Sequence, residues 1–99
     1  MLLKKMVMMD GTPVVFRYNP ETRKGVMAVD GTEDRKAEKL LSVLKASVKD
    51  VKFYGKRVRM IFTASYGDIK KGMDKVLEDK FTVVDLPDLG RMLWDSPSK

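Results

Sequence analysis

The segment DGTEDRKAEKLLSVLKASV, residues 30–48, predicts an amphipathic helix in the middle of the chain. Glu33 and Asp34 fall in the expected first turn, where the helix dipole favours negative charge. Apolar residues recur at the i, i+3, i+4, i+7 and i+11 spacing of one helical face: Ala37, Leu40, Leu41, Leu44 and Val48. Lysines dominate the other face. We therefore expect a surface helix whose apolar side covers a sheet.

Before this helix, the pattern predicts a three-stranded meander. Apolar runs at residues 3–9, 13–18 and 25–29 are separated by turn residues. Asp10-Gly11 lies between the first two runs, and Asp-Gly in that position is a strong hairpin signal. Alternation of side chains in the second run is typical of a half-buried strand.

After the helix, residues 51–54 and 57–63 predict a second hairpin around Gly55. Alternation assigns five apolar residues to its inner face: Val51, Phe53, Val58, Met60 and Phe62. Ser65 and Asp68 resemble a capping box that opens a second helix. The expected core stripe of this helix is Ile69, Met73, Val76 and Leu77.

The C-terminal part of the chain predicts one more strand and a short helix. Residues 81–84 are apolar on both faces, as is typical of an inner strand. The helix expected after Pro87 carries Leu89, Met92, Leu93 and Trp94. Residues 96–99 are expected to be a flexible tail, which leaves one domain over residues 1–95.

The order of the elements predicts an α+β fold. From Val26 onward it is strand, helix, strand, strand, helix, strand, the ferredoxin-like βαββαβ arrangement, with two extra N-terminal strands. The expected architecture has two layers, with both main helices on one face of the sheet. A rival grouping into two β-β-α units uses the same elements and gives another strand order, and the sequence leaves both open.

The composition limits the possible chemistry. The chain contains no Cys, His or Gln and only one Asn, so the commonest general base, transition-metal ligand and thiol nucleophile are absent. We expect no catalytic residues, cofactor or metal. The shortage of heat-labile residues beside abundant charge predicts high thermal stability. No apolar stretch approaches the length of a membrane span, so the cytoplasm is the expected location.

Two carboxylate motifs have ordinary structural explanations. Asp30-Gly31-Thr32 is similar to the end of an Asp-x-Asp-Gly-Thr phosphotransferase run, but Ala28 occupies the position of the nucleophile. A turn and helix cap explain it. Asp85 and Asp88 could hold a hard cation, but carboxylates on either side of a proline more often cap a helix.

The charge distribution is the strongest functional signal. Residues 35–59 contain nine Lys or Arg and only two acidic residues, a local charge of +7 against +6 for the whole chain. Several of these cations, and one tyrosine, are expected on the open face of the sheet. Cations that follow phosphates beside an aromatic ring suit single-stranded nucleic acid or another polyanion. The candidate binding residues are Arg17, Lys52, Tyr54, Lys56, Arg57 and Arg59.

Other interpretations remain open. The same lysines could form a solvated surface of a stable protein, or meet an acidic partner. The chain could also be a homodimeric or partner-binding domain, joined through the Met-rich strand at residues 3–9 or through the open sheet. An enzyme is the third hypothesis.

Overall fold

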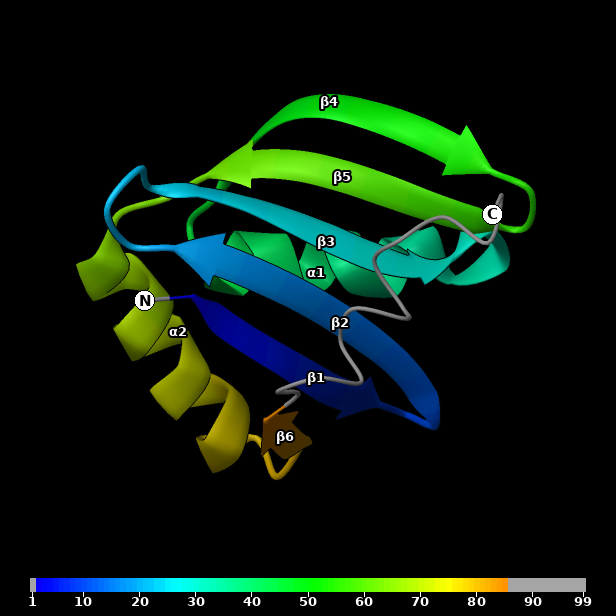
Figure 1. Ribbon diagram of the computed structural model, residues 1–99. Helices are drawn as coiled ribbons and strands as arrows, with labels where there is room; N and C mark the ends of the chain where they lie inside the picture. Colours follow the sequence, from blue (N-terminus) through cyan, green and yellow to red (C-terminus); the bar gives the residue numbers. More distant parts are fainter. Residues whose placement is uncertain (1, 86–99) are drawn as a thin grey trace.

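The computed structural model describes residues 2–85 (Figure 1). The elements in this part of the chain are, in order, β1 (Leu3–Met9), β2 (Thr12–Asn19), β3 (Lys24–Asp30), the 3₁₀ turn η1 (Gly31–Glu33), α1 (Asp34–Val43), β4 (Ser47–Tyr54), β5 (Arg57–Thr63), α2 (Tyr66–Glu78) and β6 (Thr82–Asp85). The predicted last helix, the predicted tail at 96–99 and Asp88 lie outside the described residues. Within residues 2–85, neither α-helix is long and apolar enough to cross a membrane.

The six strands form one antiparallel sheet in the order β4-β5-β3-β2-β1-β6. The predicted α+β class is confirmed, but the ferredoxin-like order is not. That order would place β6 beside β3, whereas β2 occupies this edge of β3 and β6 pairs with β1. A short turn joins β2 to β3, so these two strands pair directly and β2 takes the edge of β3 that β6 would need. The two extra strands are thus inserted into the sheet.

The four strands at the β4 end of the sheet form two hairpins, each followed by a helix. The β2–β3 hairpin precedes α1, and the β4–β5 hairpin precedes α2. The hairpins join through antiparallel pairing of β3 with β5. The alternative grouping into two β-β-α units therefore describes this part of the sheet.

The predicted N-terminal meander is present, and its first turn has the expected chemistry. Asp10 and Gly11 both have positive φ angles, 53° and 85°. Two successive residues of positive φ make the type I′ turn that matches the twist of a hairpin. The prediction from Asp-Gly is confirmed.

Both helices end in the same motif. Lys45 follows α1 and Lys80 follows α2, and each has a left-handed backbone, with φ of 53° and 67°. After α1, the Lys45 N–H donates to the Ser42 carbonyl and the Ala46 N–H to the Leu41 carbonyl. The corresponding bonds repeat after α2. These are Schellman motifs with lysine where glycine is usual.

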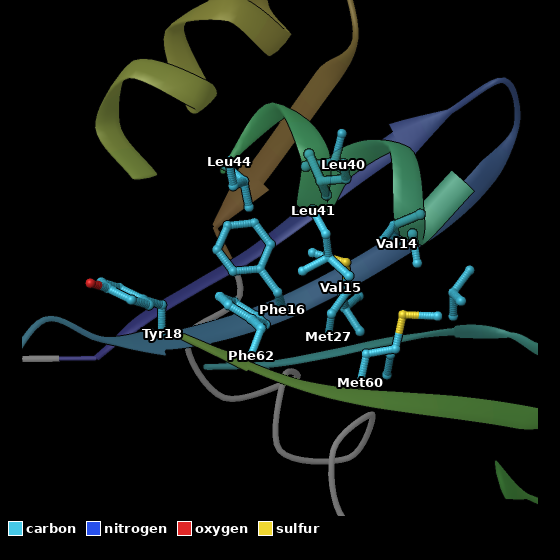
Figure 2. Packing of buried hydrophobic residues seen from close by; sticks show 14 of the residues in the cluster. Val14, Val15, Phe16, Tyr18, Met27, Leu40, Leu41, Leu44, Met60 and Phe62 are labelled. Atoms are coloured by element: carbon cyan, nitrogen blue, oxygen red, sulfur yellow. The ribbon is translucent and has the colours of Figure 1, made fainter. Parts of the chain in front are cut away.

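The helices and the main core lie on one side of the sheet (Figures 1 and 2). Alternate residues of β2, β3 and β5 point to this side and meet Ala37, Leu40 and Leu41 of α1. A Cβ on Gly72 of α2 would lie 2.6 Å from a Leu44 methyl carbon. Gly72 therefore allows α2 to pack closely against the end of α1. Central side chains of the core are Val14, Phe16, Tyr18, Met27, Val58, Met60 and Phe62.

Several predicted core residues are exposed, each for a positional reason. Val48 is in β4 rather than in α1, because the helix ends at Val43. Val51 and Phe53 share the inner face with Met60 and Val58 but are 44% and 66% exposed. Their strand is at the edge of the sheet. Leu77 is 57% exposed near the end of α2.

The edges of the sheet also differ from expectation. β6, predicted as an inner strand, is a short edge strand. β1, proposed above as a free edge for dimer formation, lies between β2 and β6. Pairing through a free edge of residues 3–9 is therefore wrong. The long, exposed edge strand is β4.

Candidate anion-binding groove

The β4–β5 hairpin presents three predicted cations and the tyrosine on the side of the sheet away from the helices, here called the open face. Lys52 pairs with Arg59 and Tyr54 pairs with Arg57. Paired residues in an antiparallel ladder point to the same face. Val58, between the two arginines, points to the core and is buried. Strand alternation therefore places these polar side chains as expected.

Cross-strand pairing brings Arg17 to the same region. Arg17 on β2 pairs with Val26 on β3, and Val26 pairs with Ile61 on β5. These residues line a shallow concavity of about 200 Å³, here called the basic concavity. Its full lining is Arg17, Val26, Lys52, Tyr54, Arg59 and Ile61. Four of the six predicted binding residues thus meet at one hollow.

Tyr54 and Arg59 act as a unit. The guanidinium carbon of Arg59 lies 4.8 Å from the centre of the Tyr54 ring. At this distance the cation is attracted to the ring face. The contact limits the positions of both side chains and leaves the guanidinium with planar N–H donors for a phosphate or a base.

Lys52 has a weak internal partner. Its Nζ atom lies 3.8 Å from a carboxylate oxygen of Asp50, and both side chains are about half exposed. An exposed pair at this distance contributes little stability. Lys52 can therefore exchange Asp50 for an external anion at small cost.

Lys56 and Arg57 do not line the basic concavity. Lys56 is in the β4–β5 turn, where its carbonyl accepts the Gly31 N–H. Arg57 pairs across the strands with Asp30. Hydrogen bonds from the Thr32 hydroxyl and N–H, then the nearby charges of Lys56 and Arg57, hold the pKa of Asp30 below its usual value. The Asp30 carboxylate thus partly neutralises the positive charge of Lys56 and Arg57.

A second hollow continues the basic concavity along the open face. It measures about 290 Å³ and shares Arg17, Val26 and Ile61 with the first. Its other lining residues are Leu2, Tyr18, Asn19, Lys24 and Gly25. Together the two hollows form a groove with an apolar floor at Val26 and Ile61 and cations around it. We call this feature the open-face groove.

Sequence reasoning missed part of this groove. Lys24 was absent from the candidates because it lies outside the basic segment 35–59, although alternation from Val26 places it on the same face. In addition, the cations of the basic segment 35–59 do not all lie on the open face of the sheet. Lys36 bonds Thr12 and Glu33, and Lys39 lies over the Phe81 ring. The local charge of +7 is therefore not one surface.

Two carboxylates of these motifs, Asp30 and Asp85, have partners within the described residues, whereas Asp88 lies outside them. Asp30 accepts hydrogen bonds from the Thr32 N–H at 2.9 Å and the Thr32 hydroxyl at 2.7 Å, as the turn interpretation predicts. Asp85 forms an ion pair with Lys5 on β1. Within residues 2–85, no group of three or more acidic side chains is placed to hold a metal ion.

Comparisons with known proteins do not assign the chain to a family. No protein family model, curated protein or solved structure matches the chain.

Proposed function

We propose that the open-face groove binds single-stranded nucleic acid, weakly and with little sequence preference. The observation that supports this most directly is the meeting of Arg17, Lys52, Arg59 and Tyr54 at one hollow. Cations follow the phosphates of a single strand, and aromatic or guanidinium planes stack its bases. The groove contains both kinds of group.

The apolar floor gives the groove a second property that suits bases. Val26 and Ile61 line both hollows, with Lys24 and Asn19 farther along. A base can cover apolar surface while its phosphate meets a cation. The lining offers few side chains to read base edges, so binding energy should come mainly from charge and stacking.

Fluorescence anisotropy with labelled RNA and DNA oligomers at about 50 mM salt tests this proposal. If four cations engage phosphates, log K should fall against log salt with a slope near −3. An inorganic polyphosphate of equal charge serves as competitor. Equal competition per charge would reduce the function to polyanion binding, because polyphosphate cannot stack. Absence of binding at about 100 µM protein would rule out the proposal, since that is weaker than ordinary non-specific association.

A further inference from the structure

β4 is the strand with the largest share of exposed residues in the sheet. Within the described residues, β4 pairs only with β5, and seven of its eight residues are exposed. Val48, Val51 and Phe53 point to the helix side, beyond the area that α1 covers. They continue the row of buried side chains on β5, but they are themselves exposed to solvent. Such an edge invites pairing with another strand.

The hydrogen bonding of Val51 identifies where such a strand would dock. The Val51 N–H donates to the carboxylate of its neighbour Asp50 at 2.9 Å. The same carboxylate is the one near Lys52. The Asp50 carboxylate therefore contacts two groups that a second strand could bind instead: the Val51 N–H and the Lys52 ammonium group.

The sequence of β4 is complementary to itself in one antiparallel register. A two-fold axis through Val51 places Val51 opposite its own copy, and Asp50 opposite Lys52 in both directions. It also brings Phe53 opposite Lys49, the residue at the bulge in β4. Moving the axis to Asp50 or to Lys52 would put like charges directly opposite each other, which is destabilising. Of these three neighbouring registers, charge complementarity therefore selects the one about Val51.

We propose that two copies of this chain form a dimer by antiparallel pairing of β4 about Val51. The Val51 N–H of each copy donates to the Val51 carbonyl of the other. This frees each Asp50 carboxylate to pair with Lys52 of the second copy. The bulge between Val48 and Asp50 limits regular pairing to a few residues. The interface is therefore small, and we expect a dissociation constant in the micromolar range or weaker.

This dimer extends the groove. The axis is perpendicular to the sheet, so the open faces of both copies lie on the same side. Lys52 and Tyr54 belong to β4 itself, and the two basic concavities therefore lie on either side of the axis. The role of this longer groove rests on the proposed function, whereas the dimer itself does not. The test of the dimer therefore contains no nucleic acid.

Cysteine cross-linking tests the register directly. The chain has no cysteine, so one introduced cysteine can only form a disulfide with another copy. Residues directly opposite in a hydrogen-bonded pair have Cα atoms about 5.5 Å apart, which suits a disulfide. We expect Val51→Cys to cross-link under mild oxidation at least about tenfold faster than Val84→Cys. Val84 is a matched control, since it is 39% exposed on the other edge strand. Equal rates would overturn the proposal.

A charge exchange tests the pairing independently. Asp50→Lys and Lys52→Asp should each raise the dissociation constant at least about tenfold in sedimentation equilibrium, because each places like charges opposite each other. The double variant restores opposite charges and should recover the wild-type value within about threefold. Circular dichroism confirms folding of each variant. A wild-type monomer at all concentrations up to about 1 mM, or no recovery in the double variant, would overturn the proposal.

Discussion

Tyr18 and Phe62 stack against each other across Gly25, with ring centres 6.4 Å apart and ring planes 7° from parallel. The three residues form one row on β2, β3 and β5, because Gly25 pairs with Tyr18 on one side and Phe62 on the other. The missing side chain of Gly25 leaves room for both rings. This row joins the two hairpins at the end of the sheet near α2.

Replacing Gly25 tests how tightly this row is packed. A Cβ there would run into the Phe62 ring and lie 2.8 Å from the Arg17 carbonyl oxygen. We expect Gly25→Ala to lower the free energy of unfolding by about 2 kcal/mol or more, as overpacking of a core does. Urea denaturation measures it. Gly67→Ala is the control, since a Cβ at Gly67 meets nothing within 4 Å. Equal effects of the two substitutions would contradict this view of the row.

The hydroxyl of Tyr18 predicts loss of stability at high pH. Tyr18 is buried and its hydroxyl donates to the Ala64 carbonyl at 2.6 Å. Burial is the main cause that raises the pKa of this phenol above its usual value of 10.0. The folded state therefore favours the protonated form. This contribution is complete below pH 10 and is lost as the pH rises through the higher pKa of the folded state.

Tyr18→Phe provides the control for that pH dependence. It leaves the Ala64 carbonyl without its donor and should cost about 1 to 2 kcal/mol at neutral pH. Its free energy of unfolding should then change less than that of the wild type between pH 9 and pH 11 or so, when followed by urea denaturation. If both proteins lose stability in parallel, another group is responsible.

The two helix ends predict substitutions that stabilise the fold. Lys45 and Lys80 have left-handed backbones that glycine adopts without steric cost. We expect Lys45→Gly and Lys80→Gly each to raise the free energy of unfolding by about 0.5 to 1 kcal/mol. Lys75→Gly, inside α2, should instead lower it by about 1 kcal/mol. Thermal unfolding followed by circular dichroism separates these outcomes, and destabilisation in all three would show that the caps are not strained.

Single substitutions in the groove separate charge from stacking. Arg59→Ala and Lys52→Ala should each reduce the salt slope of nucleic acid binding by about 0.7, the value for one phosphate contact on a single strand. Lys71→Ala removes a cation on α2, on the helix side of the sheet, and should change neither slope nor affinity. Anisotropy titrations at several salt concentrations provide both quantities. A Lys71 variant as weak as the Arg59 variant would indicate binding without a defined site.

Tyr54 contributes a ring and also supports Arg59. Tyr54→Ala should therefore weaken binding by about 1 to 3 kcal/mol, and Tyr54→Phe should retain most of the affinity because the ring remains. The same titrations measure both variants. If Tyr54→Phe is as weak as Tyr54→Ala, the hydroxyl rather than the ring is the important group.

Local signals predicted most of the elements. The Asp10-Gly11 turn, the spacing of Leu40 and Leu41, and the Ser65 cap all depend on residues near one another in sequence, and the Ser65 hydroxyl does accept the Asp68 N–H. Strand order depends on contacts between distant residues. It was therefore not predictable that β1 and β2 would lie between β3 and β6.

The groove also combines features that depend on nearby residues with features that depend on contacts between distant residues. Lys52, Tyr54 and Arg59 belong to one hairpin, so alternation alone brings them to one face. Val26 and Ile61 meet them only because β3 pairs with β5. The sequence left that pairing open, and the apolar floor of the groove could not be inferred before the sheet was known.

The position of β1 between β2 and β6 sets an order of assembly. Lys5 of β1 pairs with Asp85 of β6, 80 residues farther along the chain. On a ribosome, β1 and β2 can form their hairpin early, but the outer edge of β1 remains without its partner until β6 has been synthesised. Closing so distant a contact is slow compared with forming the hairpins. Until then, β1 exposes Met6 and Val7 at an unpaired edge, with Lys4 and Lys5 as the charges that discourage premature pairing there.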